Sequence, residues 1–362
     1  MAYDGGVKLL TRGQIDARIE DLVARYCAVP DADGAQAVVS LVAAQAVASS
    51  KGGKRLRALL ELGAFAAAAP EDADPTPAAD VACAIEIFQT AALVHDDIID
   101  DSDLRRGAPS AHRALSDALR SRSRGDGLGL MLGDLLATAS VHVLHDAART
   151  LPHGDAIDSV FLAMQREVEV GQIMDVAIET LPLDDDRTLL DTVLRTDRSK
   201  TASYTTIAPL ELGLLCAGTD PRAAHEAAVR IGEPLGVAFQ INDDLIDVTG
   251  TTATTGKPVG GDIREGKRTV LLADTLSHLS GAERESLIEA YGAPDESARD
   301  TQAIIGLFRS SGAIDDSRRR IAGLWTAAET ALDEQSRLLG LDADRARVLR
   351  DHCAAMLPGF AL

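Results

Sequence analysis

Two clusters of aspartate, far apart in the chain, each follow an apolar stretch with helical periodicity. If these stretches are helices, with about 3.6 residues per turn, Asp96 and Asp100 stand one turn apart on one face. Carboxylates gathered beneath apolar residues repel one another and usually need a cation, and Mg²⁺ prefers such oxygen ligands. The carboxylates are Asp96, Asp97 and Asp100 in the first cluster, and Asp243, Asp244 and Asp247 in the second.

The second aspartate cluster decides how the first is interpreted. Acidic residues spaced four apart are more often a solvated helix face, so one cluster alone would favour that interpretation. Two such helix ends facing each other would instead form an acidic cleft that holds more than one Mg²⁺ around a diphosphate. We therefore predict a metal-diphosphate site.

Basic residues lie at several further places where they could hold an anion. Lys54, Arg55 and Arg57 follow a glycine pair and precede an apolar helix, an arrangement that lets a backbone and three cations approach an anion. The other cations are Arg105 and Arg106 after the first aspartate cluster, Lys200 beside Thr201, and Lys257 and Lys267 in a long glycine-rich loop. The competing interpretations are a mobile basic loop, arginines paired with the nearby acids, and ordinary surface residues.

The composition favours a helical protein and excludes several functional classes. The 362 residues are 46% hydrophobic but only 3% aromatic, and alanine is abundant, which favours helix over sheet. A net charge of −20 without lysine runs argues against nucleic acid as a partner. The 4 cysteines lack zinc or disulfide spacing. No signal peptide is evident and charges interrupt the long apolar runs, so we expect no transmembrane segment and a cytoplasmic location.

The periodicity of apolar residues predicts where the helices lie. We expect helices at about 11–27, 34–49, 58–69, 78–101, 128–149 and 155–180, with loops at 102–110 and 121–127. Lys200 and Thr201 are expected in the first turns of another helix. From residue 269 onward the pattern predicts four or five amphipathic helices that carry no evident chemistry. No internal linker demands a second domain.

Taken in order, the motifs resemble those of the trans-isoprenyl diphosphate synthases, the family of farnesyl and geranylgeranyl diphosphate synthases. The resemblance covers about residues 52–269. The matching stretches are Gly52-Gly-Lys-Arg-Leu-Arg57, Asp96-Asp-Ile-Ile-Asp100 with Arg105-Arg-Gly107, Lys200-Thr201, Phe239-Gln-Ile-Asn-Asp-Asp-Leu-Ile-Asp247, and Gly256-Lys257 with Gly266-Lys267. The resemblance implies an all-α helical bundle around a deep central cavity, formed as a single domain by residues 1–362 and usually assembled as a homodimer. Residues 1–33 would be a peripheral or dimer-interface segment.

The resemblance also implies a role for each motif. Asp96 and Asp100 would bind two Mg²⁺ ions and Asp243 a third, with Asp97, Asp244 and Asp247 supporting them. The allylic diphosphate would be held by Arg105, Lys200, Lys257 and Lys267, and isopentenyl diphosphate by Lys54, Arg57, Arg106 and Gln89. Gln89 departs from the histidine of many relatives, and Ala58 from the usual proline. Gln89 keeps a hydrogen-bonding side chain and is expected to be tolerated, whereas Ala58 would affect only the local turn.

The implied reaction is head-to-tail condensation by a prenyltransferase of isoprenoid biosynthesis. Neutralising the allylic diphosphate allows its C–O bond to ionise in a dry pocket, and the double bond of isopentenyl diphosphate then attacks the carbocation. Lys200, Thr201 and Gln240 would be the catalytic residues, with the hydroxyl and amide stabilising the cation. The departed diphosphate would remove the proton, so that His95 has a structural or supporting role.

The product length depends on the helix below the first aspartate cluster. Ala92 lies one turn below Asp96 and Phe88 two turns below, so both face the same way. Ala91 and Ala92 are small where relatives that stop at fifteen carbons often have an aromatic residue. Phe88 would then form a lower floor, which favours geranylgeranyl diphosphate (C20), with farnesyl or longer polyprenyl diphosphates as alternatives. The first motif lacks the two-residue insertion that many bacterial geranylgeranyl diphosphate synthases have, so this comparison gives the C20 assignment no support.

Two other functions compete with this interpretation. A class I terpene cyclase shares the helical fold and ionises the same diphosphate, but it has no need of a second basic site such as Lys54, Arg57 and Arg106. Its second metal motif is also usually of the Asn/Ser/Glu type, whereas here it is rich in aspartate. A non-catalytic regulatory subunit tends to lose its acidic motifs, and both are intact here.

Replacing Ala92 with phenylalanine tests the floor at Phe88. The added ring would stop the growing prenyl product above Phe88, so A92F should form a shorter prenyl diphosphate than the wild type. Mass spectrometry of the products measures this, and an unchanged chain length in A92F would refute the assignment of these residues.

Overall fold

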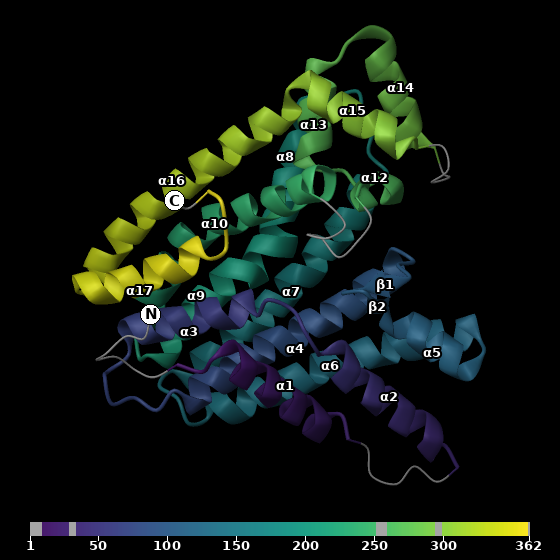
Figure 1. Cartoon of the computed structure of the whole chain (residues 1–362). Helices are drawn as coiled ribbons and strands as arrows, with labels where there is room; N and C mark the ends of the chain where they lie inside the picture. The colour runs from purple at the N-terminus through teal and green to yellow at the C-terminus, as the bar shows by residue number, and fades with distance from the viewer. Residues whose placement is uncertain (1–8, 29–33, 251–258, 294–298, 361–362) are drawn as a thin grey trace. The chain divides into compact units, whose positions relative to one another are not determined.

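The computed structural model describes residues 9–28, 34–250, 259–293 and 299–360, and helices make up most of them (Figure 1). The chain forms two compact units. The first unit consists of Met1–Ala163, Ala208–Glu226 and Ser336–His352, and the second of Met164–Ile207, Ala227–Gln335 and Cys353–Leu362. The single domain expected over residues 1–362 stays a prediction.

The first unit is built around a long buried helix. Its elements are α1 (Arg12–Tyr26), α2 (Gln36–Ser49), α3 (Leu56–Ala68), α4 (Thr76–Ile99), β1 (Leu104–Arg105), β2 (Ala108–Pro109), α5 (Ala111–Leu119), α6 (Arg122–Ala148) and α9 (Ala208–Cys216). It also contains the start of α7 (Gly154–Ile178) and of α10 (Pro221–Thr249), and most of α17 (Ala343–Ala354). Helix α4 packs against α1, α3, α5, α6 and α9 (Figure 1). Its alanine-rich sequence suits this position, because small side chains let neighbouring helices pack closely on several faces.

Helix α6 begins earlier than the sequence predicted. We expected a loop at 121–127, but α6 starts at Arg122 and continues through Gly125 and Gly129. These glycines are contact points, because a Cβ on Gly125 would lie 2.0 Å from Ser116 Oγ, and one on Gly129 would lie 2.9 Å from both His112 Cβ and Ile98 Cδ1. Close packing against α4 and α5 therefore outweighs the low helix propensity of glycine.

The predicted loop at 102–110 contains a two-stranded hairpin. Strands β1 and β2 pair antiparallel, with Arg105 opposite Ala108. The two residues between them, Arg106 and Gly107, have φ angles of 55° and 77°. Positive φ at both turn positions is the geometry of a type I′ turn, which favours glycine at the second position. The hairpin holds Arg105 and Arg106 at fixed places beside the end of α4.

The second unit contains the rest of the long helices and the C-terminal ones. Its elements are the remainder of α7 and α10, α8 (Asp186–Thr196), the π-helix η1 (Asp197–Ile207), α12 (Gly261–Glu265), α13 (Val270–His278), α14 (Gly281–Gly292), α15 (Thr301–Ser311) and most of α16 (Ala313–Leu338). Helix α13 packs on α8 and α15, and α8 continues directly into η1. In the described part of the chain after residue 269 there are five helices, α13 to α17, in line with the predicted four or five.

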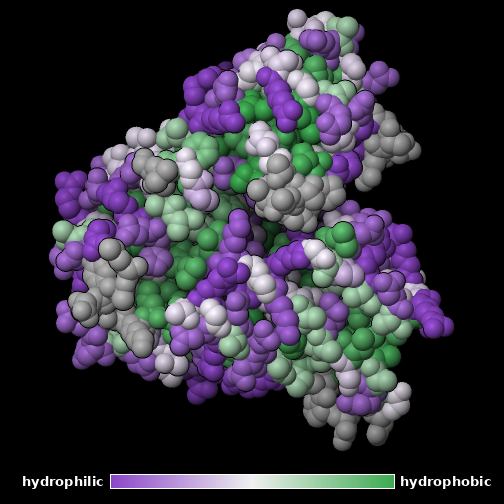
Figure 2. All heavy atoms as spheres, viewed as in Figure 1, coloured by the Kyte–Doolittle hydropathy of each residue, from purple (hydrophilic) through white to green (hydrophobic). Residues whose placement is uncertain are grey.

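Among the described residues, two helices are long and apolar enough to cross a membrane by length and composition. They are α4 and α6, and the apolar windows that pass this test are 72% and 44% buried, respectively. Core helices of water-soluble proteins pass the same test, and α4 packs on α6 in the core of the first unit. Hydrophilic residues surround smaller hydrophobic areas on the face shown in Figure 2. The expected lack of a transmembrane segment stays a prediction.

Candidate active site

The glycine pair and the cations after it form a loop between α2 and α3. Gly52 and Gly53 have φ angles of 73° and 94°, and a Cβ on Gly53 would lie 3.0 Å from Arg106 Nη2. Lys54 is exposed, whereas Arg57 is buried in the first turn of α3. We expected Arg55 to be one of the cations that could hold an anion. That interpretation is wrong, because Arg55 is buried and its guanidinium is held by protein groups.

The first aspartate cluster lies at the C-terminal end of α4. The helix ends at Ile99 with Asp100 as its C-cap, and Asp96 and Asp100 are half-buried. Asp97 is buried and accepts hydrogen bonds from Nε and Nη2 of Arg105, the Nε bond at 2.8 Å. The Arg105 Nη2 atom also lies 3.8 Å from Asp96 Oδ2. Arg105 is therefore held against the predicted metal ligands by a buried carboxylate.

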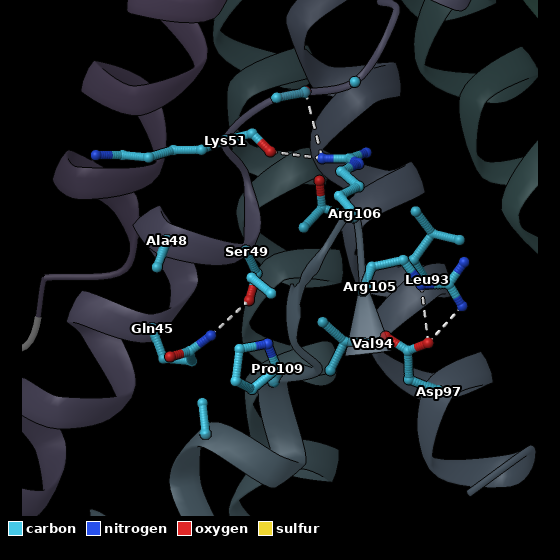
Figure 3. A pocket seen from close by; sticks show the side chains of 16 residues that line it. Gln45, Ala48, Ser49, Lys51, Leu93, Val94, Asp97, Arg105, Arg106 and Pro109 are labelled. Carbon is cyan, nitrogen blue, oxygen red and sulfur yellow. Dashed lines mark hydrogen bonds and ion pairs between the residues drawn. The ribbon is translucent and has the colours of Figure 1, made fainter. Parts of the chain in front are cut away.

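A cavity of about 590 Å³ lies beside this cluster in the first unit (Figure 3). It is bordered by α2, the Lys51–Gly53 segment, α4, the hairpin and α5. Within it, Arg106 Nη1 donates hydrogen bonds to the carbonyl oxygens of Lys51 and Gly52, at 2.7 and 3.3 Å. Arg106 is the one residue of the predicted isopentenyl diphosphate set that lines the cavity, since Lys54, Arg57 and Gln89 do not. The cavity therefore adjoins that predicted site without containing it.

The predicted chain-length residues lie on α4 below the aspartates. Phe88 and Ala91 are buried, and Ala92 is half-buried. The Phe88 ring contacts Phe161 of α7 edge-on, with ring centroids 6.3 Å apart. Sequence reasoning missed Phe161, because the pattern around it is that of any amphipathic helix. His95 lies on the same helix, and its Nε2 atom is 3.3 Å from the carbonyl oxygen of Leu130. This contact fits the structural or supporting role expected for His95.

In the second unit, Lys200 and Thr201 lie on a π-helix, whereas we expected the first turns of a new α-helix. Element η1 packs closely on α7 and α10, because a Cβ on Gly171 would lie 2.3 Å from the Lys200 nitrogen and one on Gly236 2.5 Å from Ala202 Cα. Short π-helical segments occur often at functional sites. The 11-residue length of η1 was not evident from the sequence, since apolar periodicity does not distinguish π from α over so few turns.

Lys200 is oriented by a carboxylate of α7 that no sequence motif marked. Its Nζ atom lies 2.5 Å from Asp175 Oδ2 of α7. Nearby, Asp197 is buried, and burial together with the negative charge of Asp175 raises its pKa to about 8. No motif in the sequence marked Asp175 or Asp197. The only available signal was their recurrence on the faces of apolar helices.

Thr201, Gln240 and Asp244 form a hydrogen-bonded chain. The Thr201 hydroxyl donates to Gln240 Oε1 at 2.6 Å, and Gln240 Nε2 donates to Asp244 Oδ1 at 2.7 Å. Asp244 is buried, which raises its pKa well above the ordinary value, and the negative charge of Asp262 raises it further. The chain fixes the orientation of the Gln240 amide, and it ties both predicted catalytic polar groups to the second aspartate cluster.

The remaining members of this cluster differ in exposure. Asp243 is exposed, so its carboxylate can reach a solvated ion. Asp247 is half-buried and accepts hydrogen bonds from the backbone nitrogens of Gly261 and Asp262, at 3.1 and 3.2 Å. Lys267 lies 2.9 Å from Glu265, and Lys257 falls outside the described residues. Asp247 thus holds the start of α12, which leads to Lys267.

The carboxylates of the described residues do not form a metal site by themselves. Within residues 9–28, 34–250, 259–293 and 299–360, no group of three or more His, Cys, Asp or Glu side chains is gathered closely enough to hold a metal ion. Mg²⁺ is commonly bound by one or two carboxylates, with waters and substrate phosphates as its other ligands. Asp96, Asp100 and Asp243 as metal ligands stay a prediction.

The comparisons with known proteins identify the family. The sequence profile described as polyprenyl synthetase matches residues 40–308. The chain belongs to the polyprenyl synthetase family. It is therefore an enzyme, a trans-prenyltransferase, with the all-α isoprenoid synthase fold. The resemblance that the motifs suggested is confirmed.

Two curated relatives come from Mycobacterium tuberculosis. A geranylgeranyl diphosphate synthase is 31% identical over 310 residues, 85% of this chain and 83% of the relative. A (2E,6E)-farnesyl diphosphate synthase is 34% identical over 265 residues, 72% of this chain and 68% of the relative. The crystal structure of a Corynebacterium glutamicum geranylgeranyl pyrophosphate synthase, complexed with isoprenyl diphosphate and magnesium, has a TM-score of 0.81 at 28% identity and covers 96% of this chain and 99% of that one.

Replacing Thr201 with valine tests the Thr201–Gln240–Asp244 chain. Valine keeps the volume but removes the hydroxyl that orients the Gln240 amide, so kcat should fall by about tenfold. Serine keeps the donor, and T201S should stay within about threefold of the wild type. Steady-state assays of condensation measure both variants, and a T201V enzyme with wild-type kcat would show that the hydroxyl has no such role.

Proposed function

We propose that this prenyltransferase condenses isopentenyl diphosphate with an allylic diphosphate to give a linear all-trans prenyl diphosphate, with geranylgeranyl diphosphate as the main product. The observation that carries the proposal is that, in a chain of this family, protein side chains fix three of the predicted site residues in place. Arg105 is bonded to Asp97, Lys200 is paired with Asp175, and the Thr201 hydroxyl is bonded to Gln240. Side chains already fixed in place lose little entropy when substrate binds, as catalysis requires.

The enzyme would use Mg²⁺, with Asp96, Asp100 and Asp243 as ligands and three ions in each active site. Two similar structures support a divalent metal: the Corynebacterium synthase holds magnesium, and a Caulobacter crescentus polyprenyl synthase is complexed with calcium and isoprenyl diphosphate. The raised pKa of Asp244, caused by burial and then by the neighbouring acid Asp262, also fits a site that lacks positive charge until a cation binds. Bound Mg²⁺ would neutralise the leaving diphosphate.

The protein groups divide between two diphosphates. Arg105, Lys200, Lys257 and Lys267 would hold the allylic diphosphate, and Lys54, Arg57, Arg106 and Gln89 isopentenyl diphosphate. Thr201 and Gln240 would place oxygen atoms near the allylic carbocation and exclude water that could capture it. The proton lost in the last step would go to the released diphosphate, since the mechanism uses no histidine.

The product length rests on Phe88, Ala91 and Ala92. The farnesyl and geranylgeranyl synthases named above are similarly close relatives, at 34% and 31% identity, so the family alone does not choose between them. Two small residues below the aspartates, Ala91 and Ala92, would let the growing prenyl product extend beyond fifteen carbons. The buried pair of Phe88 and Phe161 then supplies a lower floor.

We propose a homodimer in the cytoplasm as the working form. Helix α6 exposes Leu130 and Met131, which are 45% and 55% accessible, and helix α7 exposes Ile173, which is 68% accessible. Large apolar side chains at such exposure favour burial against another protein surface. The partner we propose is a second copy of this chain, because the family resemblance implies a homodimer.

Purified protein should be incubated with Mg²⁺, isopentenyl diphosphate and each allylic primer in turn, with products sized by mass spectrometry. The proposal predicts a linear C20 diphosphate, its loss on chelation of the metal, and little product from D96N. Linear products of another length would keep the condensation but contradict the floor at Phe88. A cyclic hydrocarbon formed from the primer alone would overturn the proposed function.

A further inference from the structure

The Arg55 side chain is buried at the junction of four elements in the first unit. It is 2% exposed and sits at the N-cap of α3 in the left-handed conformation, with φ of 55°. A non-glycine residue with positive φ is strained, and a buried charge is costly unless it has partners. The contacts around Arg55 must therefore offset the backbone strain and compensate the buried charge.

Each nitrogen of the Arg55 guanidinium has a different partner. The Nε atom donates to Asp16 Oδ1 of α1 at 2.6 Å, and Nη2 donates to the carbonyl oxygen of Ser50, the C-cap of α2, at 2.6 Å. The Nη1 atom lies 3.4 Å from Glu86 Oε2 of α4. One side chain thus connects the start of α3 to α1, α2 and α4.

Glu86 makes a second connection to the same helix. It is 1% exposed, and its Oε1 atom accepts a hydrogen bond from the backbone nitrogen of Ala58 at 3.2 Å. The first turn of a helix leaves backbone N–H groups without partners, and a carboxylate is favourable there. The α3 N-cap makes no side-chain cap of its own, so Glu86 supplies that contact from α4.

We propose that Asp16, Arg55 and Glu86, here called the Arg55 clamp, position the residues that bind isopentenyl diphosphate. The clamp fixes both ends of the segment that carries Lys54 and Arg57. Glu86 lies three residues before Gln89 on α4, so it also sets the spacing between this segment and Gln89. Arg106 is tied to the same segment through the carbonyls of Lys51 and Gly52. Arg55 itself touches no substrate and acts through its neighbours.

The test is the variant Glu86→Gln, which keeps the shape of the side chain and an oxygen for the Ala58 N–H but removes the charge opposite Arg55. This test rests on the proposed function. We expect the KM for isopentenyl diphosphate to rise by about tenfold, because a small displacement of binding groups has a large effect, whereas kcat and the KM for the allylic diphosphate stay within about twofold. A purely structural role would lower the active fraction without this split.

The variant Asp80→Asn is the matched control. Asp80 on α4 pairs with Arg18 of α1 at 2.7 Å, so it joins the same two helices as the clamp without contacting the loop. D80N should leave both KM values unchanged. If E86Q does not fold, D16N removes the half-buried end of the clamp instead and should raise the same KM to a smaller extent. Equal changes in both KM values, or the same change in D80N, would overturn the proposal.

Hydrogen exchange separates this proposal from the proposed function. E86Q should increase exchange in a peptide containing Ala58, because the neutral amide oxygen accepts the Ala58 N–H more weakly than the carboxylate does. D80N should not change this exchange. A wild-type enzyme that forms no product would overturn the proposed function, and the exchange result would still test the clamp. Faster exchange in E86Q without a selective rise in the KM for isopentenyl diphosphate would show that the clamp is structural only.

Discussion

The pairing of poorly solvated charges is the constraint on which the site depends. Three cations lie where water has limited access, each held by protein partners. They are Arg55 with Asp16, Ser50 and Glu86, Arg105 with Asp97, and Lys200 with Asp175. A buried charge is tolerated only when its partners are fixed, so each pair also fixes the backbone that carries it. The loop before α3, the hairpin after α4 and the π-helix η1 are held by these pairs. These three segments, with the first turn of α3, carry five of the predicted diphosphate-binding cations, namely Lys54, Arg57, Arg105, Arg106 and Lys200.

Close helix contacts at glycine provide the second support. Gly133 brings α6 against His95 of α4, and Gly171 brings α7 against the backbone of Lys200. A helix can approach another this closely only where no Cβ intervenes. Within each unit, the glycines thus place the helices at the spacing that the charged pairs need.

Sequence reasoning predicted the features that depend on residue type and local spacing. The aspartate clusters, the all-α class and most helix ranges follow from composition and from the period of apolar residues. The start of α6 was missed because glycine indicates a loop locally, whereas here it marks a packing contact. Arg55 was misread because the sequence does not show which of three neighbouring cations is buried. Asp175 and Phe161 were missed because their partners are distant in the chain. The metal-ligand assignments stay predictions.

Metal-dependent binding of an unreactive allylic diphosphate analogue tests the central claim most directly. Calorimetric titrations would compare the wild type with Asp96→Asn and Asp243→Asn, each with and without Mg²⁺. The account predicts that Mg²⁺ strengthens binding by about a hundredfold in the wild type, and that each substitution removes most of this gain because both aspartate clusters contribute ligands. Binding that does not depend on Mg²⁺, or that loses nothing in either variant, would contradict the account.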